Sequence, residues 1–296
     1  MEITQKQVAE LRAETGVGIM ECKKALVEAA GNFDDARKIL RKKGLAAAAS
    51  KAGRATSEGL VVAHLAPTAA VLLEVNCETD FVARTEAFRL FAEKIAERIA
   101  IHDAFGELRA GAGADVGSLS WPSEPSVADA VAQLVATLKE NIQIRRFARL
   151  VPRAGETFAH YIHGNGRIGV VVGLRAGDES LARDLAMHVA ASDPRFALRS
   201  EVTPEILETE REIARAQAAA AGKPANIVER IAEGKVEKFY QETVLTEQAF
   251  VKDPEKTVGQ VLVERGSPES LDVRFVRFKL GEASARPVSE GEALAS

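Results

Sequence analysis

Three histidines and two cysteines are the side chains best suited to catalysis or metal binding, and their spacing does not assemble a site. His160 and His163 lie three apart in a predicted strand, so they point to opposite faces and cannot share a metal ion. His188 falls in an amphipathic helical segment, where a packed or surface histidine is the ordinary outcome. Cys22 and Cys77 lack the close pairing of a zinc site or a disulfide framework, so we expect two buried, small apolar side chains.

Phosphate-binding loops are not predicted either. No GxxxxGK[ST] stretch occurs, and Gly164-Asn165-Gly166 is a hairpin-turn signal, because Gly and Asn tolerate positive φ. We therefore expect no catalytic residue, no cofactor and no metal. Side chains distant in sequence can still meet in space, so a hydrolase or transferase that gathers these histidines with carboxylates stays open as an alternative.

Residues 76–83 connect a predicted strand to a predicted helix, and they read Asn-Cys-Glu-Thr-Asp-Phe-Val-Ala. Asp80 stands where its carboxylate can accept backbone N–H bonds, as the N-cap of a helix starting near Val82. Phe81 follows in the turn itself. From the residues alone, Phe81 is most simply a staple packed on its own helix, because most large apolar side chains are buried.

Composition and charge limit the classes of protein. Of the 296 residues, 46% are hydrophobic, which is enough for one or two buried cores and a small additional domain. The formal net charge is −4. A general nucleic-acid binder needs a basic surface, so direct nucleic-acid binding is not expected. Residues 1–55 contain eleven Lys/Arg and seven Asp/Glu. This basic head indicates either a surface with its own function or a solvated helical face.

No targeting or membrane segment is predicted. The start, Met1-Glu2-Ile3-Thr4, lacks a signal or transit pattern, and no apolar run approaches the roughly 20 residues that span a bilayer. We expect a cytoplasmic protein that does not bind membranes.

Residues 3–44 are predicted to form three short helices. Thr4 and Gln7 make a capping box, apolar residues recur three and four apart, and Gly16, Gly31 and Gly44 end the helices. Each apolar face is too narrow to be stable alone, which favours a compact bundle. Residues 45–56 are rich in Ala and Lys and are predicted to be a helical tether.

The central residues predict a duplicated α+β unit. Strands at 59–65 and 71–76, a helix at 82–101, a loop at 103–125 and a helix capped by Ser126 form the first copy. The second copy would consist of strands at 142–151, 157–163 and 167–174 and a helix that Asp178 opens. An antiparallel helical hairpin is predicted at 203–241, then a short helix at 256–264 and a strand at 271–278. The predicted domains are 1–55, 56–141, 142–280 with the inserted hairpin, and a loose tail at 281–296.

Six runs in the same order resemble translation elongation factor Ts of the bacterial type, over residues 3–281. The runs are Thr15-Gly16-Val17-Gly18-Ile19-Met20-Glu21-Cys22-Lys23-Lys24-Ala25-Leu26, Asn76-Cys77-Glu78-Thr79-Asp80-Phe81-Val82-Ala83, Glu140-Asn141-Ile142-Gln143-Ile144-Arg145-Arg146, Arg167-Ile168-Gly169-Val170, Met187-His188-Val189-Ala190-Ala191-Ser192 and Lys256-Thr257-Val258-Gly259-Gln260. The sequence departs from the family at Ala249, where relatives often carry Pro, and after Gly281, where some relatives end in a helix that clasps the partner.

The resemblance implies a ubiquitin-associated-like N-terminal bundle, two related α+β subdomains and an inserted helical hairpin. It implies a guanine-nucleotide exchange factor, not an enzyme, that binds elongation factor Tu in its GDP-bound and nucleotide-free forms, displaces Mg²⁺ and lets GTP enter. Thr79, Asp80, Phe81 and Val82 would form the working segment, with Phe81 pushed into the partner and Asp80 helping to displace the groups that hold Mg²⁺.

Three further residues are implied to contact the partner. Ile19 and Met20 match an apolar pair, and we favour Met20, because Ile19 also fits the core stripe of the bundle. His188 falls in the matching segment of the second subdomain, with packing as the equal alternative. A ubiquitin-associated-like adaptor without exchange activity is the alternative function.

Overall fold

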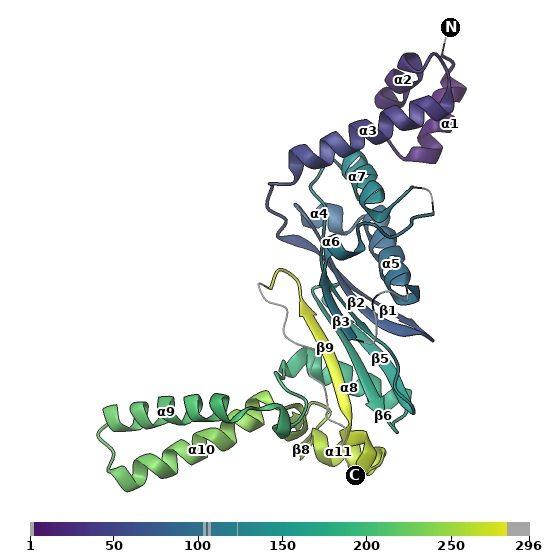
Figure 1. Cartoon of the computed structure of the whole chain (residues 1–296). Coiled ribbons are helices and arrows are strands. Elements are labelled where there is room, and N and C mark those ends of the chain that lie inside the picture. Colours follow the sequence, from purple (N-terminus) through teal and green to yellow (C-terminus); the bar gives the residue numbers. More distant parts are fainter. Residues whose placement is uncertain (1–2, 103–104, 106–107, 123, 283–296) are drawn as a thin grey trace.

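The computed structural model describes residues 3–102, 105, 108–122 and 124–282, and its fold class is α+β, as predicted. The first elements are α1 (Gln5–Thr15), α2 (Ile19–Glu28), α3 (Phe33–Lys51), β1 (Glu58–Ala66), β2 (Ala69–Cys77), α4 (Asp80–Ala83), α5 (Glu86–Ile101), β3 (Leu108–Ala112), α6 (Gly113–Val116) and α7 (Val127–Leu138). The remaining strands and α-helices are β4 (Gln143–Leu150), β5 (Glu156–His163), β6 (Ile168–Arg175), α8 (Glu179–Ser192), α9 (Pro204–Ala220), α10 (Ala225–Thr243), β7 (Ala249–Phe250), β8 (Asp253–Thr257), α11 (Val258–Arg265) and β9 (Val273–Lys279). Figure 1 shows α1–α3 at one end, the sheets in the middle and α9–α10 projecting sideways at the other end.

The N-terminal helices pack around a core of their own that includes Leu11, Cys22, Leu26 and Leu40. Thr4 caps α1 in a capping box with Gln7, as predicted. The third helix does not end at Gly44 but continues to Lys51, so the predicted tether is largely a part of α3. A Cβ at Gly44 would lie 3.3 Å from the carbonyl oxygen of Ala132, so this glycine permits a close approach of α3 to α7.

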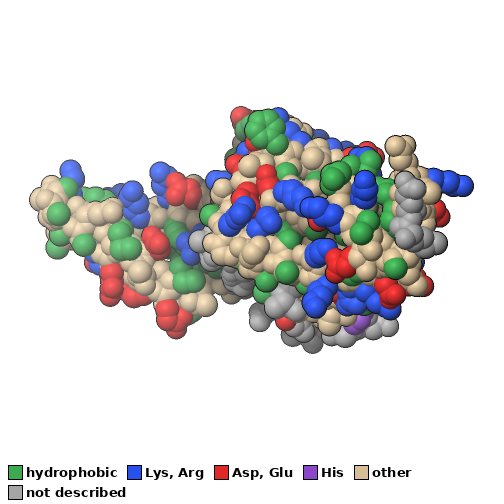
Figure 2. Space-filling model, turned by 90° about the horizontal axis from the view of Figure 1, so that it is seen from above, with side chains coloured by type: hydrophobic (Ala, Val, Ile, Leu, Met, Phe, Trp, Pro, Cys, Tyr) green, Lys and Arg blue, Asp and Glu red, His purple; other side chains and the backbone are tan. Residues whose placement is uncertain are grey.

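Polar contacts attach the bundle to α7. The Arg41 guanidinium donates from Nε and Nη2 to the two carboxylate oxygens of Asp129, at 2.9 and 3.0 Å. Gln133 donates from Nε2 to the carbonyl oxygen of Thr15 at 2.6 Å. Seen from this end of the molecule, Lys and Arg side chains spread over the surface with acidic side chains between them (Figure 2). The basic head therefore presents mixed charge, with several of its cations already paired.

The Arg41–Asp129 contact predicts a pH-dependent stability. The hydrogen bonds from Arg41 lower the pKa of the Asp129 carboxyl, aided by Ser126, although burial acts the other way. Because the folded pKa lies below the unfolded one, the ionised carboxylate stabilises the fold above about pH 4, and this stabilisation is lost as the pH falls through the folded value. We expect Asp129→Asn to lower the melting temperature by roughly 2–4 °C at pH 7.

Thermal melting from pH 7 to pH 3 measures this contribution. The gap between wild type and Asp129→Asn should close below about pH 4. Asp35→Asn, which removes an exposed contact to Lys38 within one helix, is the matched control and should shift the melting temperature little. A gap of constant size over the whole pH range would contradict the assignment.

The first sheet has four strands in the order β1-β2-β4-β3, all antiparallel. Helices α5 and α7 cover it with a core that includes Phe88, Ile95, Ile99 and Val127. Strand β3 and helix α6 lie within the segment predicted as a loop, residues 103–125. Glycine and alanine carry little strand signal, which explains why β3 was not predicted.

The second sheet has three strands in the order β5-β6-β9, and α8 and α11 pack on it through a separate core. The predicted boundary between residues 141 and 142 assigns β4 to this second unit, whereas β4 pairs with β2 and β3 of the first sheet. Pairing between strands that are distant in the chain has no local sequence signal. The sequence alone therefore does not separate β4 from β5 and β6, which follow it. Each sheet does start with a hairpin followed by a covering helix, which is the order that a duplication requires; the duplication itself stays a prediction.

The two sheets face each other through an apolar layer. Its buried members are Val61, Ala70, Leu72, Ala148 and Leu150 from the first sheet and Val171, Val276 and Phe278 from the second. At Gly169 of β6, a Cβ would lie 2.5 Å from Cγ1 of Val61, so any larger residue would push the Val61 side chain out of its present position. A buried ion pair borders the layer: Glu74 of β2 accepts from Arg146 at 2.7 Å and from the Gly281 N–H at 2.9 Å.

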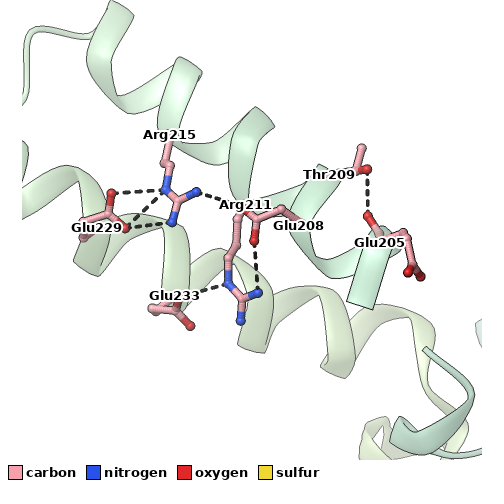
Figure 3. Close-up of polar contacts among 7 residues, drawn as sticks. All are labelled: Glu205, Glu208, Thr209, Arg211, Arg215, Glu229 and Glu233. Carbon is pink, nitrogen blue, oxygen red and sulfur yellow. Dashed lines mark hydrogen bonds and ion pairs between the residues drawn. The ribbon is translucent and has the colours of Figure 1, made fainter. Parts of the chain in front are cut away.

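Helices α9 and α10 form an antiparallel pair over the segment predicted as a hairpin. The buried seam is narrow and consists mainly of alanines, Ala214, Ala218 and Ala232, followed by Val236 toward the base. Ion pairs between the helices supplement it: Arg215 Nε lies 3.1 Å from Glu229 and Arg211 Nε lies 3.0 Å from Glu233, as Figure 3 shows. The base of the pair is apolar and includes Phe239 and Val244.

We expect Arg215→Ala to loosen the distal half of α9 and α10 without unfolding the protein. Exposed ion pairs contribute little individually, so the global melting temperature should hardly change. Amide hydrogen exchange across the distal half should become faster, and 1 M salt should produce a similar change in wild type. Lys238→Ala removes an exposed pair with Glu242 inside one helix and should leave exchange at the distal half unchanged. Protection equal to wild type in Arg215→Ala would show that the alanine seam suffices.

The C-terminal residues are described only in part. Of the predicted loose tail, residues 281–296, those from 283 onward lie outside the described residues. Three short 3-10 helices, Arg199–Glu201, Leu245–Glu247 and Pro268–Leu271, complete the second half. None of the helices in the described part combines the length and apolarity that crossing a bilayer requires.

Candidate functional site

Thr79, Asp80, Phe81 and Val82, which we call the tip, lie where the chain leaves β2 and makes the single helical turn α4. Thr79 is extended, with φ −128° and ψ 153°, and its Oγ1 accepts the N–H of Val82 at 3.4 Å. Two residues, Arg84 and Thr85, separate α4 from α5, so the predicted helix 82–101 is interrupted. The tip is therefore a short, capped turn between the first sheet and its covering helix (Figure 1).

Asp80 is not the helix cap, and that prediction is wrong. The N-cap is Thr79, and Asp80 is the first residue of α4. Both residue types cap helices well, and the extended backbone of Thr79 decides between them. The Asp80 carboxylate instead pairs with Arg84 at 2.8 Å, and 38% of the Asp80 side chain is exposed. Asp80 therefore presents a carboxylate at the surface beside Phe81.

Phe81 is 78% exposed and belongs to none of the buried clusters of the described residues. The staple interpretation is therefore wrong. Val82 does pack, as a partly buried side chain against the first core. The turn thus fixes itself through Val82 and exposes the aromatic ring of Phe81.

Cys77 supports the tip from the end of β2. Its Sγ donates to the carbonyl oxygen of Thr79 at 3.1 Å. Burial, together with the negative charge of Glu140, raises the pKa of the Cys77 thiol to about 12. The thiol is therefore protonated at neutral pH, as suits a packed side chain.

Ile19 and Met20 begin α2, and both are exposed, by 51% and 59%. The core role considered for Ile19 is not observed, because Ile19 lies outside the bundle core. Sequence reasoning missed Val27, which is 60% exposed seven residues after Met20 and so lies on the same helix face. Lys23 and Lys24 occupy the positions between them and are also exposed. This face of α2 combines apolar and basic side chains. The seven-residue spacing between Met20 and Val27 is the sequence pattern that could have identified it.

His188 has no exposed surface, so it cannot contact another protein in this conformation. The N–H of Val251 donates to Nδ1 at 3.2 Å, which leaves Nε2 to donate to Oε1 of Gln248 at 2.9 Å. Burial lowers the pKa of His188, and the Gln248 bond offsets this in part. The ring is thus neutral and structural, and the packing alternative is the one that the structure supports.

His160 and His163 do not form a site with each other. His160 and His163 lie on the same strand, β5, and His163 bonds through Nδ1 to the Tyr161 hydroxyl at 3.1 Å. No group of three or more potential metal ligands occurs among the described residues. Residues 164–169 fit the letters of a GxGxxG pattern, but they join β5 to β6 in a hairpin and open no helix.

Comparisons with known proteins agree on one family. The model of the family "Elongation factor TS" matches residues 78–282. "Elongation factor Ts" of Thioalkalivibrio sulfidiphilus is 47% identical over 286 residues, covering 95% of this chain and 93% of that protein. The protein of the same name from Alkalilimnicola ehrlichii is 43% identical over 97% of this chain and 94% of its own length. The one from Rhodospirillum rubrum is 44% identical over 98% and 96%.

Proposed function

The chain belongs to the elongation factor Ts family of translation elongation factors, and we propose that it is a guanine-nucleotide exchange factor for elongation factor Tu. It binds elongation factor Tu carrying GDP, loosens the contacts that hold Mg²⁺ and phosphate, and promotes GDP release and GTP entry. Exchange makes and breaks no covalent bond, so the protein acts by binding and not as an enzyme. We place it in the cytoplasm, where bacterial translation takes place.

The exposure of Phe81 carries the proposal. A phenylalanine that is 78% exposed on a capped turn loses apolar hydration only when another molecule covers it. Aromatic side chains that enter a partner's pocket supply a large share of binding free energy. Because the turn is already formed in the free protein, little ordering is needed on binding.

Asp80 gives the tip its effect on the metal. The carboxylate lies one residue from Phe81 and pairs with Arg84 at the surface, so insertion of the ring brings this exposed ion pair close to the nucleotide site. Mg²⁺ requires near-octahedral oxygen coordination and bridges phosphate to protein, so a small displacement of its ligands weakens nucleotide binding. Linkage makes the effect reciprocal: nucleotide must weaken the binding of the factor by the same ratio.

The α2 face supplies a second contact. Ile19, Met20 and Val27 offer apolar surface, and Lys23 and Lys24 offer positive charge, which suits an apolar partner patch with an acidic rim. We regard the N-terminal bundle as ubiquitin-associated-like and the two sheets as copies of one ancestral unit.

Release of fluorescent GDP from elongation factor Tu tests the proposal. The full chain at micromolar concentration should accelerate release in the presence of excess unlabelled nucleotide. If release stays at its spontaneous rate, the proposed function is wrong. If the chain binds elongation factor Tu without accelerating release, the adaptor alternative is favoured.

A further inference from the structure

One carboxylate, that of Glu140, holds the start of the tip. Its Oε2 accepts the backbone N–H groups of Glu78 and Thr79, both at 3.0 Å, and its Oε1 accepts the Thr79 hydroxyl at 2.5 Å. The pairing of β2 with β1 ends at Cys77, so these two N–H groups have no strand partner. Glu140 accepts both, although it lies 62 and 61 residues further along the chain.

The contact with Thr79 also determines how α4 begins. The Thr79 hydroxyl has one proton, which it donates to Glu140, so its lone pairs are left for the N–H of Val82. Helix α4 is a single turn, and one turn of helix is not stable by itself. The orientation of Asp80 and Phe81 therefore depends on a cap whose rotamer Glu140 fixes.

Glu140 is itself held in place. Lys139, in the left-handed region with φ 66°, ends α7 and redirects the chain. In the opposite direction, the Glu78 carboxylate accepts the N–H of Asn141 at 2.6 Å, so each segment binds the other's backbone. The Asn141 side chain donates to the carbonyl oxygen of Arg54 at 2.8 Å, which joins this crossed pair to the chain after α3.

We propose that Glu140 is a positioning residue for nucleotide exchange, whose carboxylate presents Asp80 and Phe81 in the geometry that enters the partner. This inference rests on the proposed function. Glu140 acts through Glu78 and Thr79, and charge-assisted bonds to three donors make it a strong anchor. Without it, the tip must be ordered during binding, which slows exchange.

Glu140→Ala is expected to slow GDP release from elongation factor Tu, at limiting concentrations of the factor, by roughly ten- to a hundredfold, because all three donors lose their charged acceptor. Glu140→Gln keeps one acceptor oxygen and should fall between Glu140→Ala and wild type. Glu97→Ala removes an exposed carboxylate of α5 and is the matched control. It should accelerate GDP release from elongation factor Tu as much as wild type does.

Changing Glu140 in two different chains, the wild type and one without the tip side chains, distinguishes a positioning role from a general structural one. In a chain that already carries Asp80→Ala and Phe81→Ala, removing Glu140 should slow release little further, because nothing is left to position. A full additional loss in that background, or release at the wild-type rate in Glu140→Ala, would overturn the proposal.

Amide hydrogen exchange of the free chain gives a readout that needs no partner. In Glu140→Gln and Glu140→Ala, residues 78–83 should exchange faster, while α5 keeps its protection. Unchanged protection of residues 78–83 would refute the anchor. If the wild-type chain does not accelerate GDP release from elongation factor Tu, the proposed function is wrong. The hydrogen-exchange measurement still decides whether Glu140 orders the tip.

Discussion

Phe81→Ala is expected to slow GDP release from elongation factor Tu by about thirtyfold, the effect of removing an aromatic anchor that contributes about 2 kcal/mol. The melting temperature should stay at the wild-type value, because a ring that is 78% exposed contributes little to the core. Stopped-flow fluorescence of labelled GDP at several factor concentrations measures the loss, and circular dichroism measures folding.

Ile101→Ala is the matched control. Ile101 is 54% exposed at the opposite end of α5, roughly 22 Å along that helix from its start near the tip. This variant should accelerate GDP release from elongation factor Tu as much as wild type does. Equal losses in both variants would mean that exposed apolar area, and not the tip, matters. Loss of structure in Phe81→Ala would restore the staple interpretation.

Arg274→Ala is expected to have the largest effect on stability. Arg274 of β9 is 1% exposed, and its Nε and Nη2 donate to the two carboxylate oxygens of Glu156 at 2.6 Å. Nη2 also donates to the carbonyl oxygen of Val151, just after β4. Truncation leaves the buried Glu156 carboxylate without its cation, which costs about 3–5 kcal/mol. The urea midpoint should fall accordingly.

Changing both partners distinguishes loss of the pair from loss of packing. Arg274→Met combined with Glu156→Gln removes both charges and should recover much of the stability, because a buried ion pair replaced as a whole is often nearly neutral. Urea unfolding of the two single variants and the double variant completes the cycle. A double variant as unstable as the sum of the singles would contradict a coupled pair.

Strands and helices that are bounded by turn or capping residues were predicted well from the sequence. The turn signals placed β1, β2, β5 and β6 close to their observed bounds, and Asp178 marked the start of α8. Long-range contacts decided the rest. Gly44 was predicted to end α3, but it permits close packing on α7, and β4 joins the first sheet through pairs that no local pattern encodes.

The tip shows how far residues alone can predict a site. They located the turn but assigned its cap to Asp80 instead of Thr79, and the exposure of Phe81 depends on how β2, α4 and α5 are arranged in space. Glu140 lies 61 residues from Thr79, so its role had no sequence signal. For His188 a signal existed: it is seven residues after Leu181, on the buried face of α8.

If the tip promotes exchange by loosening Mg²⁺ in elongation factor Tu, the effect of the factor must depend on bound Mg²⁺. The most direct measurement is the acceleration of labelled GDP release by the wild-type chain, first with Mg²⁺ at millimolar concentration and then with a chelator in excess. We expect a large acceleration with Mg²⁺ and a clearly smaller one after chelation, because the contact that the tip disrupts is then already absent. An acceleration of the same size in both conditions would contradict it.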